Sequence, residues 1–415
     1  MNLTAMGMTD GVGSMLVGAQ EQDYEILGNI EWRKYYHSGT WQKNFPGAFM
    51  VYNWDQMGKL IPQNITMIMG HPECGQWSNL GFASLGKSQS RYEVPSDIPV
   101  FIDGVKRVKP EFFAMDNLVK SLYAVPLTKW NEELPEYDIF AEYISNYHYG
   151  NSQLCRKRMF IIGSKKKYEY VFQPNEKDHS NSVWDIIGEL YGKDENDFFN
   201  HYQFPGETKS AYRDYYEKRY YTIDEAAEEF KKLRAGIAPR YLNDDGEEKN
   251  RIGMMKLYKD KHSHTLTGSN YHMHPESGKP LTCRERARIQ GFPDSFEFVF
   301  AKESDHWNAN MSKQTGKAMP IQFCRFLSKQ FKNHINNISS PNTGDRFLRN
   351  DLIETSKITY CKEVGYSNQA QACKWCSIED CPIRLESSQA KYQIKKSTPR
   401  QSRQTKEPKE WFSWN

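Results

Sequence analysis

Short apolar segments alternate with helical or polar segments over the first part of the chain. Four of them predict β-strands, because each is of strand length and is followed by a polar or glycine residue. They cover residues 25–30, 65–69, 112–115 and 159–163. A glycine-punctuated opening, residues 10–14, leads into a predicted helix that ends at Ala19. Strands that alternate with helices predict an α/β fold with an open, mostly parallel sheet, in which ligands gather at the carboxyl ends of the strands.

The composition changes in the middle of the chain. Residues 168–258 are rich in tyrosine, lysine and acidic side chains and contain no strong apolar run. One helix is predicted there over residues 222–235, because Thr222 begins it with a capping box and Gly236 ends it. We interpret this region as an inserted, more polar domain and assign residues 166–261 to it.

The chain becomes compact again from His264. A helix with apolar periodicity is predicted over residues 320–331, and the Asn- and Ser-rich residues 333–342 are interpreted as a linker. We therefore expect residues 1–165 and 262–335 to form one α/β domain around the insert.

The net charge of +3 is unevenly distributed. Residues 382–415 contain eight Lys or Arg and three Glu, so this end carries +5 and residues 1–381 carry −2. The basic tail, residues 391–415, is either a solvated, partly disordered end or an arm that contacts phosphates.

Hydropathy and cysteine usage limit the class of protein. A mean hydropathy of −0.80 and the absence of a long apolar run argue against a membrane span or a membrane partner. The first ten residues lack the basic start and apolar centre of a signal peptide. Four of the eight cysteines stand alone and four are crowded near the C-terminus, which favours a reducing compartment, and hence the cytoplasm, over a disulfide scaffold.

Residues near the first two predicted strands suggest a cofactor site. Gly11 and Gly13 allow close approach of the backbone to a ligand, although this pattern alone is also typical of a simple turn. Glu31 ends a strand about 20 residues later, where an acidic residue binds ribose hydroxyls in nucleotide-binding sheets. Trp32 could cover a purine ring or belong to the core. Together these residues predict an adenosine-containing cofactor.

Cys74 lies in a loop after a predicted strand, surrounded by glycine, proline and serine. A lone cysteine is commonly an inert buried thiol, but this setting favours a presented one. A nucleophilic cysteine requires the thiolate and therefore a positive neighbourhood. Arg156 and Arg158, in another loop beside a strand, can supply that charge or orient an anionic or carbonyl-bearing substrate, and Asp116 is a candidate acid.

The order of these motifs resembles that of the C5-cytosine DNA methyltransferase family, over most of residues 8–165 and 262–332. The matching segments are TDGVGS (9–14), EW (31–32), NFP (44–46), PECGQWS (72–78), KP to DNL (109–118), YG to RKR (149–158), LTCRERARIQGFPD (281–294) and QTGKAMP (314–320). The segment at 281–294 is the most specific. The resemblance implies a Rossmann-like class I methyltransferase sheet, with the insert as a target-recognition domain and a small C-terminal Cys-rich module.

The same resemblance implies a mechanism. Cys74 attacks C6 of a cytosine that is flipped out of double-stranded DNA, and C5 then takes a methyl group from S-adenosylmethionine. Asp116, in the place of the family's Glu, hydrogen-bonds or protonates N3. Arg158 holds the O2 edge, and Arg156 assists the loop and the thiolate.

Several residues differ from the family pattern. Glu73 replaces the second proline of the Cys74 loop, and a carboxylate beside a thiol tends to raise the thiol pKa. Asn53 occupies the position of an Asp that contacts the adenine amino group in the family, and Asp55 nearby is the rival candidate. Lys317 replaces an Asn beside the cofactor. Lys317 is either a solvated surface lysine or an ammonium directed at the cofactor pocket, which would favour an extra negative charge there. The second interpretation leads to a hypothesis: the cofactor is carboxy-S-adenosylmethionine, which places a carboxymethyl group on C5.

Four cysteines lie outside this resemblance, in residues 343–390. Cys361, Cys373, Cys376 and Cys381 form a C-x11-C-x2-C-x4-C pattern. Four thiolates can complete a tetrahedral zinc site, and C-x2-C is a common knuckle spacing. An iron–sulfur cluster is the second interpretation, and four unligated cysteines the third.

The sequence therefore predicts a monomeric DNA cytosine-C5 methyltransferase from a prokaryotic or phage-infected host cell, of the restriction–modification kind. Besides the carboxymethyltransferase hypothesis, two alternatives remain open. One is a tRNA cytosine-5 methyltransferase with the same motifs, and the other is a catalytically inactive DNA-binding relative.

Overall fold

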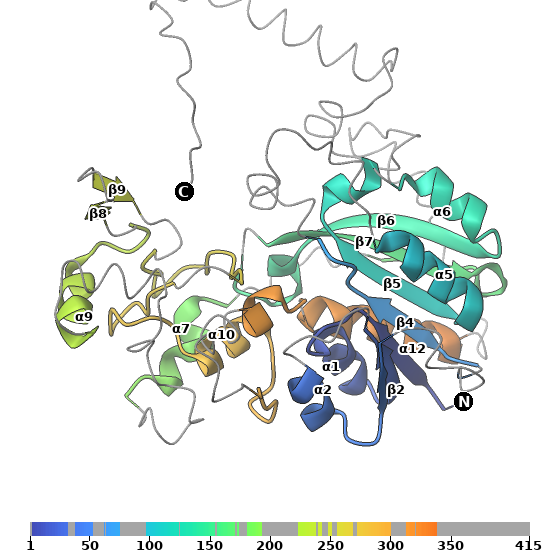
Figure 1. The fold of residues 1–415 in the computed structure, drawn as a ribbon, viewed down its shortest axis with the longest axis horizontal. Coiled ribbons are helices and arrows are strands. Elements are labelled where there is room, and N and C mark those ends of the chain that lie inside the picture. Colours follow the sequence, from blue (N-terminus) through green and yellow to red (C-terminus); the bar gives the residue numbers. More distant parts are fainter. Residues whose placement is uncertain are drawn as a thin grey trace, which may run out of the picture.

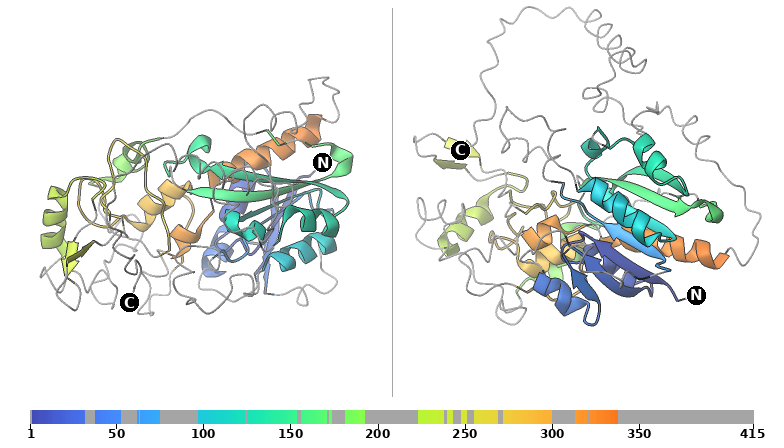
Figure 2. Two further views of the ribbon diagram at one scale, coloured as in Figure 1. Left: turned by 90° about the horizontal axis from the view of Figure 1, so that it is seen from above. Right: turned by 45° about the vertical axis from the view of Figure 1, so that its right-hand side comes forward.

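The protein is described from a computed structural model, shown in Figures 1 and 2. The described residues are 2–31, 38–52, 62, 64–74, 97–123, 125–153, 156–170, 172–173, 181–192, 223–237, 240–242, 248–250, 255–268, 272–299, 313–319 and 321–337.

A seven-stranded sheet in the order β3-β2-β1-β4-β5-β7-β6 forms the centre of the fold (Figure 1). Its strands are β1 (Thr4–Met8), β2 (Glu25–Ile30), β3 (Phe49–Val51), β4 (Met67–Gly70), β5 (Phe112–Asn117), β6 (Tyr137–Ser145) and β7 (Lys157–Lys165). The pairs from β3 across to β5 are parallel, whereas β7 runs antiparallel to both β5 and β6. The carboxyl ends of β1, β4 and β5 therefore meet at one edge of the sheet, beside the beginning of β7.

Helices cover both faces of this sheet. Helices α1 (Ser14–Gln20) and α12 (Ile321–Asn337) pack together, and their apolar side chains belong to one core cluster. Helices α5 (Ile98–Val108) and α6 (Leu127–Glu133) contribute to a second cluster on the other face. Figure 2 shows α12 and α5 on opposite sides of the sheet. Helix α2 (Ser38–Asn44) precedes β3, and the short 3-10 helices are Val119–Tyr123, Asn146–Tyr149, Lys166–Tyr168 and Gly188–Leu190.

The remaining elements extend from one end of the sheet. They are α7 (Val183–Ile187), α9 (Ile223–Lys232), the antiparallel pair β8 (Arg240–Leu242) and β9 (Glu248–Asn250), and α10 (Cys283–Gln290). In both figures α9, β8 and β9 lie at the far end of the molecule from the sheet, and α10 lies between them and the sheet (Figures 1 and 2). Lys256 Nζ donates to the carbonyl of Lys231 at 2.7 Å, which ties α9 to the chain that leads back to the sheet.

The described strands confirm the α/β prediction and extend it. All four predicted strands are present, although β7 and β5 are longer than their apolar runs, and six of the seven strands point the same way. Three strands, β1, β3 and β6, were not predicted. Strand β1 contains Met and Gly, β3 has three residues, and the apolar run of β6 is short and interrupted by polar side chains.

The predicted helices have shifted boundaries. Helix α9 spans residues 223–232 within the predicted 222–235, and Gly236 has the left-handed φ of +81° expected after it. Helix α12 starts at Ile321 as expected and continues to Asn337, through the beginning of the predicted linker. The Cys-rich module and the basic tail lie outside the described residues. Within those that are described, no helix is long and apolar enough to cross a membrane.

Candidate active site

The loop that carries Cys74 is fixed by the ends of its neighbouring strands. Gly70 ends β4, and a Cβ there would overlap the carbonyl oxygen of Met8 and the ring of Phe101, so only glycine fits. The next amide, of His71, donates to the carbonyl of Met8 at 3.2 Å. Asn117 at the end of β5 donates its side-chain amide to the carbonyl of Pro72 at 3.2 Å. The Cys74 loop is therefore held from both sides, by β1 and by β5.

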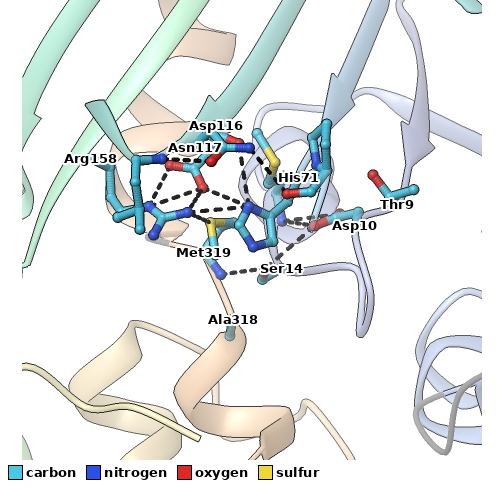
Figure 3. Close-up of polar contacts among 12 residues, drawn as sticks. Thr9, Asp10, Ser14, His71, Asp116, Asn117, Arg158, Ala318 and Met319 are labelled. Carbon is cyan, nitrogen blue, oxygen red and sulfur yellow. Dashed lines mark hydrogen bonds and ion pairs between the residues drawn. The ribbon is translucent and has the colours of Figure 1, made fainter. Parts of the chain in front are cut away.

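A buried ion pair lies beside this loop (Figure 3). Asp116 on β5 is fully buried, and Arg158 on the adjacent antiparallel strand β7 is nearly so. Arg158 Nε donates to both carboxylate oxygens of Asp116, at 2.8 and 3.1 Å, and its Nη2 donates to Oδ2. Burial raises the pKa of Asp116, but the charge and hydrogen bonds of Arg158 outweigh burial and hold the pKa below its usual range. Asp116 is consequently a carboxylate at neutral pH.

His71 joins this pair and was not recognised in the sequence. Its Nδ1 lies 2.8 Å from Asp116 Oδ2 and 3.2 Å from Arg158 Nη2 (Figure 3). Its side chain also hydrogen-bonds the thiol of Cys74. The only available signal was a histidine placed between Gly70 and the Pro-Glu-Cys segment.

The charges around Cys74 favour its thiolate. Burial raises the pKa of the thiol, and Glu73 adds to that effect. The charges of His71 and Arg158, with the hydrogen bond from His71, outweigh both and lower the pKa to about 7. The carboxylate of Glu73 therefore does not prevent thiolate formation, because two cationic side chains face the same sulfur.

The other described cysteines have the opposite environment. Cys283 and Cys324 are buried in the apolar core between the sheet and α12. Burial raises the pKa of Cys283 to about 12 and that of Cys324 well above its ordinary value. Among the three described cysteines, only Cys74 has the electrostatics of a nucleophile.

Arg156 holds the segment that contains Lys317. Its guanidinium donates to the carbonyls of Leu266 at 2.7 Å, Gly316 at 3.3 Å and Ala318 at 2.5 Å. The same segment is tied to the start of α1, because the amide of Met319 donates to Ser14 Oγ at 2.8 Å. Arg156 thus connects β7 to the backbone beside the site.

Lys317 and Glu73, two of the departures from the family pattern, form an ion pair. Lys317 Nζ lies 3.5 Å from Glu73 Oε2, and both side chains are about half exposed. Their partial exposure makes this a weak contact, so the ammonium remains available to another anion. Glu73, its partner in this contact, directly precedes Cys74 in the sequence.

The loop after β1 has the features expected of a cofactor cradle. Gly11 and Gly13 adopt left-handed φ values of +65° and +89°, and a Cβ on Gly13 would overlap the ring of Phe45. The amide of Gly11 donates to Glu31 Oε1 at 2.8 Å, and Asn29 Nδ2 donates to the same oxygen at 3.0 Å. Glu31 is thereby fixed at the end of β2 with a carboxylate able to accept hydroxyl groups.

Asp10, in the same loop, begins α1. Its carboxylate accepts the amides of Met15 and Leu16 at 3.1 Å, and the hydroxyl of Ser14 at 3.4 Å. Burial raises the pKa of Asp10 to about 7, against the lowering effect of these amides. Asp10 was not singled out in the sequence, where it resembled an ordinary turn residue.

Some predicted site residues lie outside the described residues. These are Trp32, Asn53 and the four clustered cysteines, Cys361, Cys373, Cys376 and Cys381. In the described ranges, no three His, Cys, Asp or Glu side chains form a group able to hold a metal ion.

Sequence comparison identifies relatives along most of the chain. Residues 3–333 match the family of C-5 cytosine-specific DNA methylases. The type II methyltransferase M.FnuDI of Fusobacterium nucleatum is 23% identical over 350 residues, which cover 79% of this chain and 93% of that protein. The type II methyltransferase M.MthTI of Methanothermobacter thermautotrophicus is 24% identical over 362 residues, covering 81% and 99%.

Solved structures share the fold. A putative DNA modification methyltransferase encoded in an E. coli prophage aligns with a TM-score of 0.55 at 18% identity, over 80% of this chain and 99% of that one. A DNMT2 variant of Spodoptera frugiperda aligns with a TM-score of 0.52 at 12% identity, over 80% and 99%. The seven-stranded mixed sheet is therefore that of DNMT-like methyltransferase structures.

The electrostatics predict selective reactivity of Cys74. At pH 7 we expect iodoacetamide to alkylate Cys74 at least about 100-fold faster than Cys283 or Cys324, because only Cys74 is substantially ionised and partly exposed. Peptide mapping by mass spectrometry at successive times measures the three rates. Protein unfolded in guanidinium is the control, in which the three rates should converge. Equal rates in the folded protein would contradict the proposed environment of Cys74.

Proposed function

This chain belongs to the C-5 cytosine-specific DNA methylase family, and from that premise we propose how its described residues divide the reaction. The protein is a DNA cytosine-C5 methyltransferase, homologous to the methyltransferases of type II restriction–modification systems. The family implies S-adenosylmethionine as cofactor and DNA as substrate. The observation that carries the assignment of roles is the placement of Cys74, Asp116 and Arg158 around one point at the carboxyl edge of the sheet.

Cys74 is the nucleophile that adds to C6 of cytosine. A cysteine acts through its thiolate, and this thiol has a pKa of about 7 in a loop fixed by two strands. Formation of the S–C6 bond interrupts the aromatic ring and makes C5 nucleophilic. After the methyl group is on C5, loss of the C5 proton and cleavage of the S–C6 bond restore the ring and release Cys74.

Arg158 and Asp116 orient the base. A guanidinium has several N–H donors, so Arg158 can hold Asp116 and still donate to the O2 carbonyl of cytosine. Asp116 is ionised, so it accepts hydrogen bonds from proton-bearing groups of the ring edge. Because C6 is not accessible inside a duplex, the cytosine must be flipped out of the stack to reach them.

Gly11, Gly13 and Glu31 would hold the cofactor, and their arrangement fits it. The left-handed glycines allow close backbone approach, and the fixed carboxylate of Glu31 is suited to the two ribose hydroxyls. When bound, S-adenosylmethionine supplies an electrophilic methyl group on a sulfonium. Arg156 fixes the backbone of the Lys317 segment, and Ser14 fixes Met319 against the start of α1.

DNA recognition is assigned to the insert, residues 166–261, around a catalytic domain formed by residues 1–165 and 262–335. In support of this, α9, β8 and β9 lie far from the sheet, where they can contact a duplex whose flipped base enters the site (Figure 1). Reading of sequence through the grooves requires such a separate surface. We also propose that the chain acts as a monomer on double-stranded DNA.

Replacement of Cys74 tests the assignment of the nucleophile. The Cys74→Ser variant should lose methyl transfer by at least about 1000-fold, because a serine hydroxyl is scarcely ionised at neutral pH. It should also fail to form a stable covalent complex with duplex DNA that contains 5-fluorocytosine, which the unaltered protein should trap. Transfer of radioactive methyl groups and denaturing electrophoresis measure the two effects.

The matched control is Cys283→Ser, which should keep both activities if the core tolerates it. Duplex DNA and tRNA are tested side by side as substrates. Preference for tRNA would replace the DNA assignment, and the absence of any trapped complex with the unaltered protein would identify it as an inactive relative.

A second candidate function rests on the Lys317–Glu73 contact. The ammonium of Lys317 is half exposed, and it makes a weak contact at 3.5 Å with the carboxylate of Glu73, the residue before Cys74. A carboxylate on the transferred group would offer it a second anionic partner. We therefore propose that the site also accepts carboxy-S-adenosylmethionine and forms 5-carboxymethylcytosine.

Mass spectrometry of nucleosides tests this second candidate. With carboxy-S-adenosylmethionine supplied, we expect 5-carboxymethylcytosine from the unaltered protein. The Lys317→Asn variant should lose about 10-fold, since a hydrogen bond to a charged group contributes about 1.5–3 kcal/mol and about 1.4 kcal/mol is tenfold. Methyl transfer should remain. Lys313→Asn, an exposed lysine of the same segment, is the control. Formation of 5-methylcytosine alone would contradict the proposal.

The C-terminal part is assigned from its sequence. Four cysteines in residues 343–390 are proposed to bind zinc, and the basic tail, residues 391–415, to add contacts to phosphates. Emission spectrometry should find about one zinc ion per chain, and a colourless protein would distinguish zinc from an iron–sulfur cluster. Cys373→Ser should lower the metal content. Metal-free protein that keeps its activity would contradict this assignment.

A further inference from the structure

His71 is a titratable side chain at the centre of the site to which the proposed reaction gives no role. It follows β4 directly, and its backbone amide is held by the carbonyl of Met8 at 3.2 Å. Its side chain is only 13% exposed, so its contacts are made inside the protein rather than to water. The position of the ring is therefore determined by the sheet.

The imidazole connects the nucleophile to the buried carboxylate. Nδ1 lies 2.8 Å from Asp116 Oδ2, and the side chain hydrogen-bonds the thiol of Cys74. A nucleophile within hydrogen-bond reach of a base, which is in turn oriented by a third group, is the arrangement that activates serine and cysteine nucleophiles in many enzymes. Here His71 and Cys74 come from the loop after β4, and Asp116 comes from the end of β5; Figure 3 shows His71 beside Asp116.

We propose that His71, as an imidazolium, stabilises Cys74 as a thiolate and that Asp116 is the positioning residue that orients His71. The S–H bond of Cys74 breaks, its proton passes to water, and the imidazolium remains beside the thiolate. Cleavage of the S–C6 bond at the end of the reaction returns the thiolate to the same imidazolium. The inference rests on the proposed role of Cys74 as nucleophile.

The contacts of Asp116 exclude the role of proton donor for this residue. Its two oxygens accept three contacts from Arg158 and one from His71. Arg158 also stands 3.2 Å from His71 Nδ1, and both of these nitrogens donate to Oδ2. Two cationic groups at this distance repel each other, and the shared carboxylate offsets that repulsion. Asp116 therefore makes a protonated His71 possible beside Arg158.

The groups that face His71 favour its charged form. Burial lowers the pKa of His71, but Cys74 and Asp116 raise it by charge and by hydrogen bonding, and the outcome is a pKa of about 9. From the loop between β1 and α1, the carboxyl of Asp10 also interacts with the imidazole. Against them stands Arg158 from β7, whose charge is largely compensated by Asp116.

The direction of the pH dependence follows from these two shifts. The thiol pKa is lowered to about 7 and the imidazole pKa is raised to about 9, so the thiolate–imidazolium pair predominates between these pH values. Below about pH 7 the thiolate gains a proton, and above about pH 9 the imidazolium loses its proton. Glu73, which is paired to Lys317, opposes thiolate formation.

The test measures the rate of Cys74 alkylation by iodoacetamide from pH 5 to pH 10, by peptide mapping of the full chain. The unaltered protein should show two inflections, near pH 7 and near pH 9, because the thiolate becomes more reactive once the imidazolium is deprotonated. A single inflection at about pH 8.5, the ordinary thiol value, would overturn the inference without any variant.

Two variants should shift the first inflection upward. His71→Gln removes the imidazolium, and Asp116→Asn removes the charge that keeps His71 protonated, so the inflection should move from about 7 towards 8.5. That shift lowers the thiolate fraction at pH 7 about 15-fold. Glu73→Gln is the matched control, since loss of a neighbouring carboxylate should move the inflection downward. Thermal unfolding and S-adenosylmethionine binding are measured on each variant to verify the fold.

Methyl transfer to duplex DNA, measured on the same proteins, separates the two proposals. His71→Gln should lower kcat most strongly near pH 7 and less at pH 9, where the unassisted thiol ionises by itself. If methyl transfer needs Cys74 but the inflection is unchanged in His71→Gln, the inference on His71 is wrong and the nucleophile stands. If Cys74→Ser retains methyl transfer, the proposed function of Cys74 is wrong whatever the inflections show.

Discussion

The ion pair between Asp116 and Arg158 is the contact on which the geometry of the site depends. It joins two antiparallel strands inside the protein, with Asp116 fully buried. Removal of charged groups from water costs several kcal/mol for each ion, and loss of one partner of such a pair typically costs about 3–5 kcal/mol. The pair is therefore poorly suited to contribute stability by itself. The pair instead fixes the positions of neighbouring side chains, because His71 and the sulfur of Met319 both contact the guanidinium of Arg158.

The sheet order explains why these groups meet where they do. From β1 the strand order runs outward to β2 and β3, and it then continues on the other side of β1 with β4. Ligands of α/β proteins bind at such a switch point, beyond the carboxyl ends of the strands. The glycine loop follows β1, and the Cys74 loop follows β4. Strand β7 enters the same edge from the opposite direction, so Arg158 near its beginning faces Asp116 at the end of β5. A parallel strand in that position would have placed its first residues at the other edge.

The central strands and the candidate site residues could be predicted from the sequence. The contacts between those residues could not. Strands 25–30, 65–69, 112–115 and 159–163 were recognisable because buried strands are continuous apolar runs, whereas the apolar run of β6 is interrupted by polar residues and β3 is too short to show a pattern. Motif order predicted Cys74, Asp116 and Arg158 as site residues, and the structure brings the three together. His71 gave no such signal, because its partner Asp116 lies 45 residues away and is adjacent only in the folded sheet.

The departures from the family pattern become interpretable as two compensating pairs. A carboxylate at Glu73 disfavours the thiolate, and Lys317 is the cation that approaches it. The shorter Asp116 stays close to Arg158 at the sheet edge, and His71 extends from it to the thiol. Each change is unfavourable alone: a histidine without the carboxylate would face Arg158 as a second cation, and Glu73 without its neighbours would raise the thiol pKa. Because charges within a few ångströms are energetically coupled, these four positions are expected to be non-additive when exchanged one at a time.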